Sequence, residues 1–223
     1  MRNKLRLSAA ARCFVQENSM ETKVIAIVGA ADLGRRIAYA AVLAGYHTIL
    51  EDVSPSALEQ GMAWITQALG DEVSCGKIAA AVRDAALAKI STANSAEDAS
   101  READLIIEAA SDEMEMKIEL FTIFDKFAKP GAIFASTTSS LSITELAAVT
   151  FCPERCIAMR FITDAQKSER LELVKGRETS GETIAACREL GRCMGMEISV
   201  LSEEQVLSAT ELENGSSRIS RNA

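Results

Sequence analysis

The sequence has very few of the side chains that most often carry out proton transfer at neutral pH. Its 223 residues include only one histidine. Other residue types are also scarce: there are one tryptophan and three prolines, and aromatic residues make up 4% of the chain. A single histidine allows at most one imidazole base. No apolar run approaches the roughly 18 residues that a membrane-spanning helix needs. The net charge of −8 argues against a general affinity for nucleic acids or for anionic membranes.

The sequence also shows no framework for a metal ion. The six cysteines are Cys13, Cys75, Cys152, Cys156, Cys187 and Cys193. Two close pairs occur among them, but no histidine lies near either pair, and the spacings match no common zinc motif. We therefore predict scattered, reduced thiols that behave as small hydrophobic residues, and no metal site.

Charge is distributed unevenly along the chain. Residues 1–19 carry a charge of +3 and the remainder carries −11. A lead rich in Arg, Ser and Ala is typical of an organellar transit peptide, and the alternative is a disordered extension upstream of Met20. We predict a cytoplasmic protein, with a mitochondrial location as the alternative. Residues 1–20 are then an extension or targeting segment, 21–201 a folded domain, and 202–223 a polar tail.

Between the two ends, strand patterns alternate with helix patterns. The β-branched run 24–28 stops at Gly29, as is typical of a buried parallel strand. Further strands are expected at 48–53, 89–92, 104–109, 132–136, 155–161, 171–175 and 197–201. Helices are expected at 33–44, 55–69, 77–87, 96–101, 112–128, 142–149 and 181–194. This alternation predicts an α/β fold, a Rossmann-type, doubly wound, mostly parallel sheet with helices on both faces.

The loop after the first strand has the form of a phosphate-binding loop. It reads Gly29-Ala30-Ala31-Asp32-Leu33-Gly34 and opens a helix, and Asp52 ends the next strand. Such a loop binds a dinucleotide, and an acid at the second strand's end favours NAD. Ala31 stands where the pattern has glycine, and Asp32 adds a carboxylate that can cap the helix. We predict NAD binding by Gly29, Ala31, Asp32, Leu33, Gly34 and Asp52. The alternatives are weakened binding, or a loop that caps itself and binds no nucleotide.

Three segments, 27–61, 103–121 and 133–147, carry a resemblance to a known family. Over about residues 23–200 the chain resembles the N-terminal NAD-binding domain of the 3-hydroxyacyl-CoA dehydrogenases of fatty-acid β-oxidation. These enzymes oxidise the (S)-3-hydroxyl of an acyl-CoA with NAD, using a histidine–glutamate pair as base. The resemblance implies cofactor contacts at Asp52, Asp112, Lys117, Ser139 and Thr163. It also implies a substrate-oxygen role for Ser139 and the glutamate of the pair at Glu172.

The family's catalytic histidine is absent. Arg160 stands in its place, twelve residues before Glu172. Because arginine stays protonated, it cannot accept the hydroxyl proton. We predict either that Arg160 and Glu172 form an ion pair in the old catalytic position, with Ser139 nearby, or that they form an ordinary exposed pair. The only histidine, His47, precedes the second strand at the sheet edge opposite the expected ligand site.

These departures leave three functional hypotheses. The first is a diverged family member that binds a nucleotide or acyl-CoA without turnover, as a pseudoenzyme or subunit. The second is an active NAD-dependent 3-hydroxyacyl-CoA dehydrogenase completed by a partner chain, because the family's C-terminal helical domain is missing from the sequence. The third is a structural Rossmann domain without a ligand. Apolar surface that the helical domain would cover predicts a homo-oligomer or a partner chain.

Overall fold

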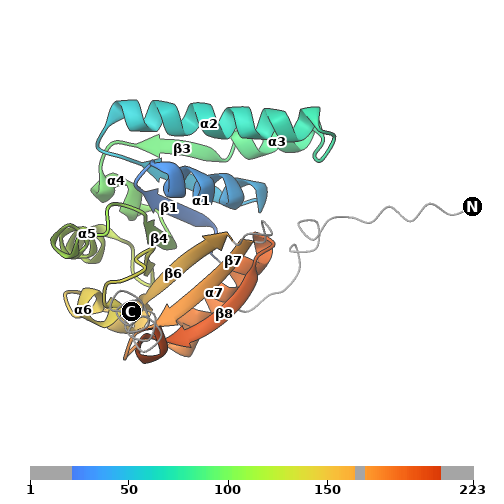
Figure 1. Ribbon diagram of the computed structural model, residues 1–223. Helices are drawn as coiled ribbons and strands as arrows, with labels where there is room; N and C mark the ends of the chain where they lie inside the picture. The colour runs from blue at the N-terminus through green and yellow to red at the C-terminus, as the bar shows by residue number, and fades with distance from the viewer. Residues whose placement is uncertain (1–21, 164–168, 207–223) are drawn as a thin grey trace, which may run out of the picture.

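One eight-stranded sheet organises the molecule (Figure 1). The computed structural model describes residues 22–163 and 169–206. The strands are β1 (Val24–Val28), β2 (His47–Glu51), β3 (Ile90–Ala93), β4 (Leu105–Glu108), β5 (Ile133–Ser136), β6 (Cys156–Thr163), β7 (Glu169–Lys175) and β8 (Glu197–Ser202). Their order is β3-β2-β1-β4-β5-β6-β7-β8. The first six strands run parallel, in the order of a dinucleotide-binding Rossmann sheet, which confirms the predicted fold class.

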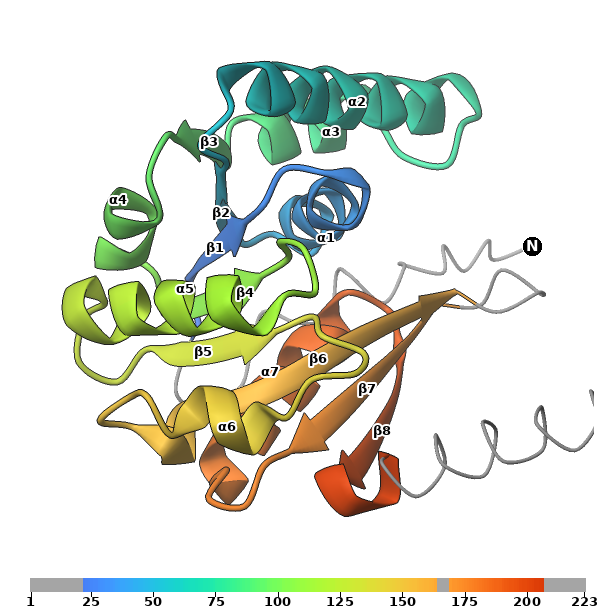
Figure 2. The same ribbon diagram turned by 60° about the vertical axis from the view of Figure 1, so that its left-hand side comes forward.

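Helices cover both faces of the sheet. They are α1 (Asp32–Leu43), α2 (Pro55–Ser74), α3 (Ala80–Leu87), α4 (Ala96–Arg101), α5 (Met114–Phe127), α6 (Ile143–Ala147) and α7 (Gly181–Cys193), with a 3-10 turn η2 (Pro153–Arg155). One core cluster joins alternate strand residues to α1, α2 and α7. A second cluster joins the other strand residues to α4, α5 and α6. Figure 2 shows α5 and α6 in front of the sheet and α7 behind it.

Local sequence accounts for these elements. Every residue of β1 after Val24 is buried, as a strand covered on both faces requires. Asp104, just before β4, accepts hydrogen bonds from the backbone N–H groups of Lys23 and Val24, both at 2.8 Å, and so fixes the start of β1. Ser54 caps α2 by accepting from the N–H of Ala57, and Pro55 occupies the first turn.

The predicted ends of several elements require correction. Helix α2 continues to Ser74 rather than ending near residue 69, and α5 begins at Met114 rather than at 112. Strand β7 pairs antiparallel with β6, so β7 and β8 run opposite to the rest of the sheet. The start of the tail predicted at 202–223 belongs to the folded domain, because Ser202 ends β8 and Glu203 accepts a hydrogen bond from the N–H of Thr144 at 3.4 Å. Residues 1–21 and 207–223, with the predictions made for them, lie outside the described residues.

Further expectations concern the state of the cysteines, a metal site and a membrane-spanning helix. Cys75, Cys152, Cys156 and Cys187 are free thiols, as predicted. Cys193 is disulfide-bonded, so the prediction that all six are reduced is wrong. The described residues contain no cluster of three or more potential metal ligands. Among the helices of 22–163 and 169–206, none is long and apolar enough to cross a membrane.

Candidate nucleotide-binding site

Most of the predicted site residues lie in a row along one edge of the sheet. The parallel strands β2, β1, β4, β5 and β6 all end at this edge. Asp52 follows β2, the glycine loop follows β1, Asp112 follows β4 and Ser139 follows β5. The strand order reverses at β1, between β2 and β4. Ligands of doubly wound sheets bind at this carboxyl edge, beside such a reversal.

The glycine loop depends on two positions that accept no side chain. Gly29 has φ +110°, and a Cβ there would lie 2.8 Å from the carbonyl oxygen of Ala109. A Cβ on Gly34 would overlap the carbonyl oxygen of Gly29. Strand β1 therefore turns sharply and α1 packs directly against the turn, as the first and third glycines of a dinucleotide loop do.

The amino end of α1 is not capped by a side chain, which corrects one expectation. Asp32 was predicted to cap the helix, but the N-cap residue is Ala31, which makes no side-chain cap hydrogen bond. Asp32 instead lies in the first helical turn and pairs with Arg35 at 2.9 Å and with Arg36 at 3.8 Å. These two arginines partly offset the negative charge of Asp32. The helix dipole at this end therefore favours an anion such as a pyrophosphate.

Asp52 joins β2 to the glycine loop. Its Oδ2 accepts a hydrogen bond from the N–H of Ala30 and its Oδ1 accepts one from the N–H of Ser54, both at 2.9 Å. The carboxylate therefore stands at the end of β2, next to the loop, where an acid receives the ribose hydroxyls of NAD. With the two tight glycines and the uncapped helix, these residues fit NAD. Ala31, exposed and extended, is the one departure in the loop.

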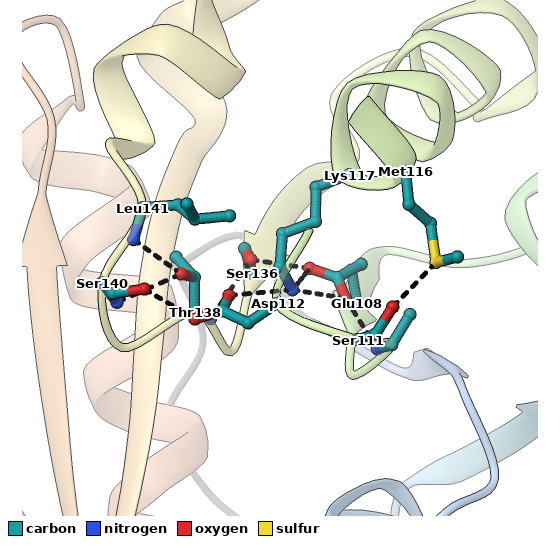
Figure 3. Close-up of polar contacts among 10 residues, drawn as sticks. Glu108, Ser111, Asp112, Met116, Lys117, Ser136, Thr138, Ser140 and Leu141 are labelled. Atoms are coloured by element: carbon teal, nitrogen blue, oxygen red, sulfur yellow. Dashed lines mark hydrogen bonds and ion pairs between the residues drawn. The ribbon is translucent and has the colours of Figure 1, made fainter. Parts of the chain in front are cut away.

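A polar network joins the loops that follow β4 and β5 (Figure 3). Ser140 donates to Oδ2 of Asp112 at 2.9 Å, and the ammonium of Lys117 lies 3.6 Å from Oδ1. Burial alone would raise the pKa of Asp112. Hydrogen bonds from Thr138 and Ser140 and the charge of Lys117 outweigh burial and lower this pKa. Asp112 is therefore an ionised side chain that bridges the two loops.

Lys117 also forms an ion pair with the fully buried carboxylate of Glu108. Its Nζ lies 2.8 Å and 2.6 Å from the two carboxylate oxygens of Glu108, and the side chains are 1% and 0% exposed. Ser136 and the N–H of Ala110 also donate to this carboxylate, both at 2.6 Å. Figure 3 shows Lys117 reaching from α5 between Glu108 and Asp112. Lys117 thus orients the loop after β4, and direct cofactor contact stays a prediction.

Arg160 and Glu172 form an ion pair whose exposure lies between the two predicted alternatives, a buried pair in the catalytic position and an ordinary exposed pair. The antiparallel register places them directly opposite each other on β6 and β7. Nη1 of Arg160 lies 3.3 Å from Oε2 of Glu172, and the side chains are 26% and 16% exposed. Ala158 on β6 pairs with Ser136, the last residue of β5. Arg160, two residues further on, therefore projects beyond β5 on the same face as Ser136.

The remaining predicted residues take simple positions. Ser139 is exposed in the loop after β5, and its N–H donates to Asp112. Leu33 is half-buried in the first turn of α1. Thr163 ends β6, opposite Glu169. His47 is exposed at the amino end of β2, the edge away from the site, so this imidazole cannot replace the missing base.

Glu51 is a buried acid that the sequence analysis missed. It ends β2 in the same cross-strand row as Glu108, with Val28 between them. The residue is 2% exposed, and its Oε1 has no hydrogen-bond partner among the described residues. Burial, aided by the charge of Asp52, raises the pKa of Glu51 to about 7. The signal in the sequence was an acid inside an apolar strand, directly before Asp52.

Replacing Glu51 with glutamine is expected to stabilise the protein at pH 8. A carboxyl whose pKa is raised in the folded state binds more protons when folded, so stability falls as pH rises from about 4.5 to about 7. Glutamine removes this cost, and urea unfolding at pH 8 should show a gain on the order of 1–3 kcal/mol. The variant should also lose this part of the pH dependence. The exposed Glu59→Gln is the control and should change little. A Glu51→Gln protein less stable than the parent at pH 8 would contradict the assignment.

One cavity lies apart from the row of site residues. It measures about 420 Å³ and is lined by parts of α1, α2, β6, β7 and the end of α7, including Trp64, Phe161 and Met194. Leu33 is the one predicted site residue in its lining. The cavity is therefore not the cofactor site.

Comparisons with known proteins agree with this geometry. Residues 24–204 match the family described as "3-hydroxyacyl-CoA dehydrogenase, NAD binding domain". A 3-hydroxybutyryl-CoA dehydrogenase of Bradyrhizobium diazoefficiens is 37% identical over 178 residues, which cover 80% of this chain and 60% of the relative. A probable 3-hydroxybutyryl-CoA dehydrogenase of Bacillus subtilis is 36% identical, with 79% and 61% covered.

The solved structures agree as well. The crystal structure of an (S)-3-hydroxybutyryl-CoA dehydrogenase from Ralstonia eutropha superimposes with a TM-score of 0.77 at 32% identity, covering 82% of this chain and 64% of that one. The chain thus spans about three fifths of the length of the relatives it matches, and the matched part is the one that carries the nucleotide loop. This match supports NAD as the cofactor. The chain belongs to the 3-hydroxyacyl-CoA dehydrogenase family and forms its NAD-binding domain.

Proposed function

We propose that this domain binds NAD, and an acyl-CoA beside it, but does not catalyse the family's proton transfer by a histidine–glutamate pair. One observation supports the proposal: Arg160, which the resemblance places where the family has its histidine, is paired with Glu172 at 3.3 Å. A guanidinium cannot accept a proton from a hydroxyl group, and an ion pair keeps the glutamate occupied. The domain then acts as a nucleotide or acyl-CoA binding pseudoenzyme or subunit.

The residues at the carboxyl edge divide the work of binding. The end of α1 and the Gly29–Gly34 loop would hold the pyrophosphate, and Asp52 would hold the adenosine ribose. Asp112 and the loop carrying Ser139 would line the nicotinamide side. NAD, when bound, supplies a hydride acceptor; no described side chain at this edge can supply the imidazole base.

Calorimetric titration tests binding and turnover separately. NAD, NADH and acetoacetyl-CoA are titrated into the purified protein, and NADH oxidation by acetoacetyl-CoA is then followed by absorbance. We expect heat of binding without turnover, and we expect Asp52→Ala to bind NAD more weakly. Turnover by the unaltered chain would overturn the impaired part of the proposal and favour an active dehydrogenase. No binding of any ligand would favour a structural domain.

Arg160→His is expected to restore part of the reaction. It returns an imidazole to β6 opposite Glu172, and a positioned general base contributes roughly 10²–10⁴ in rate. We therefore expect NADH oxidation roughly 100-fold above the parent chain in the same assay.

Arg160→Gln is the matched control for this variant. It breaks the same ion pair without supplying a base and should stay inactive. Equal inactivity of both variants would show that more than the base is missing, with Ala31 and Asp32 in the loop as the first residues to examine.

A further inference from the structure

Glu51, at the end of β2, is joined to the glycine loop through its backbone. Its carbonyl oxygen accepts a hydrogen bond from the N–H of Gly29 at 2.8 Å. Its side chain lies on the same face of the sheet as Ile49, the face that α4 and α5 cover. The next residue is Asp52, whose carboxylate accepts from the N–H of Ala30 at 2.9 Å. The carboxyl group of Glu51 is therefore only its own side-chain length away from the backbone of the loop.

The Glu51 side chain is buried, and one of its carboxyl oxygens has no described hydrogen-bond partner. The residue is 2% exposed, and its Oε1 accepts no hydrogen bond from any described residue. Glu108, in the same cross-strand row, is as deeply buried but is paired with the ammonium of Lys117. Burying a carboxylate without a donor or a cation is costly, whereas burying the neutral acid costs much less. The geometry at Glu51 thus favours the protonated carboxyl group.

The ionisable groups on the surrounding elements are exposed or already paired. Strands β1 and β3, which flank β2, contribute none. On α5, the buried Lys117 is paired with Glu108. The groups on α4 are exposed, and those in the first turn of α1 pair with one another: Glu97, Asp98 and Arg101 on α4, and Asp32, Arg35 and Arg36 on α1. Among the described residues, the charge that shifts the pKa of Glu51 is that of Asp52, which adds to the larger effect of burial.

We propose that Glu51 takes up a proton from the solvent when NAD binds, so that the adenosine half of the site holds the dinucleotide beside a neutral carboxyl group. The inference rests on the proposed function, because it needs NAD at this edge of the sheet. The pyrophosphate brings further negative charge to the loop to which Glu51 is bonded, and the dinucleotide displaces water from the strand ends. Both effects disfavour a carboxylate, so those molecules in which Glu51 is ionised before binding become protonated.

This linkage makes the affinity for NAD depend on pH. Well below the pKa of Glu51, which is about 7, the free protein is already protonated there, and binding takes up no proton. Above that pKa the free carboxyl group is mostly ionised, so binding must also add a proton, and the affinity falls as pH rises. A like charge brought this close should change the affinity by roughly three- to tenfold between pH 6 and pH 9. NAD itself has no group that titrates in this range.

Calorimetry of the full chain in two buffers measures the proton directly. NAD is titrated at pH 7.5 in PIPES and in Tris, whose heats of ionisation differ strongly, and the difference in binding heat gives the number of protons taken up. We expect roughly half a proton per NAD. ADP-ribose, which has the same adenosine and pyrophosphate but no nicotinamide, should give the same value. Equal heats in the two buffers would overturn this inference alone, whereas absence of NAD binding in both would contradict the proposed function.

Two variants assign the proton to Glu51. Glu51→Gln keeps the side chain neutral, so it should take up no proton and should bind NAD equally well at pH 6 and pH 9, more tightly than the parent chain at pH 9. Glu59→Gln, at an exposed position of α2, is the matched control and should keep the proton uptake of the parent. Circular dichroism at each pH confirms that both variants are folded. Proton uptake that persists in Glu51→Gln would belong to another group and would overturn the inference.

Discussion

Replacing Lys117 with methionine is expected to destabilise the protein by about 3–5 kcal/mol, because it leaves the buried carboxylate of Glu108 without a cationic partner. Glu108 is 0% exposed and is held by the Lys117 ammonium at 2.6 Å and 2.8 Å. The hydrogen bonds from Ser136 and Ala110 remain in the variant, but they do not neutralise the charge. The total free energy of unfolding of a small domain is about 5–15 kcal/mol, so this loss is large. Urea unfolding followed by circular dichroism measures it.

The double variant Lys117→Met/Glu108→Gln should recover most of this loss, because it removes the charge that was left unpaired. The matched control is Lys77→Met, which breaks an exposed lysine–glutamate pair with Glu72 at 2.8 Å. That change should leave the free energy of unfolding almost unchanged, because solvent screens the pair. A Lys117→Met protein as stable as the Lys77→Met protein would show that Glu108 does not depend on Lys117.

Gly34→Ala is expected to disrupt the nucleotide loop. The added methyl group would overlap the backbone carbonyl oxygen of Gly29, and it cannot rotate away because its place is fixed by the backbone of residue 34. Helix α1 must move away from β1, and the free energy of unfolding should fall on the order of 3 kcal/mol or more. Calorimetric NAD binding should be lost with it, since the pyrophosphate is held by this turn.

Gly70→Ala is the matched control for this change. Gly70 also lies in a helix, α2, but a Cβ there meets nothing within 4 Å. Alanine should stabilise α2 by about 0.5–1 kcal/mol and leave NAD binding unchanged. If Gly34→Ala binds NAD as the parent does, then the close approach of helix and turn is not needed for the site.

Much of the fold was predictable because hydrophobic runs and turn residues agree along this chain. The buried run of β1, the turn at Gly29 and the capped start of α2 each carry a local signal. The direction of β7 carried none, since the apolar run 171–175 suits either orientation. Helix α2 passes residue 69 because its next residues, Gly-Asp-Glu-Val-Ser, lack a proline to stop it.

Parts of the candidate site could be predicted from single residues whose side-chain type determines what they can do. The strand register confirms that Arg160 lies opposite Glu172, and the catalytic position assigned to this pair rests on the resemblance. Asp32 was misplaced by one helical position, because cap and first-turn acids look alike in a sequence. The partners of Asp112 and Glu108 come from separate loops and strands, so only the assembled sheet shows them.

Hydrogen bonds fix both ends of segment 138–144, which carries Ser139. Asp112 holds Ser140 from one side, and Glu203, which follows β8, holds Thr144 at the start of α6 from the other. Leu141 donates to Thr138 between them at 2.9 Å. A ligand entering beside this segment finds it already ordered. Its association therefore loses little conformational entropy here, and a larger share of the contact energy remains as affinity.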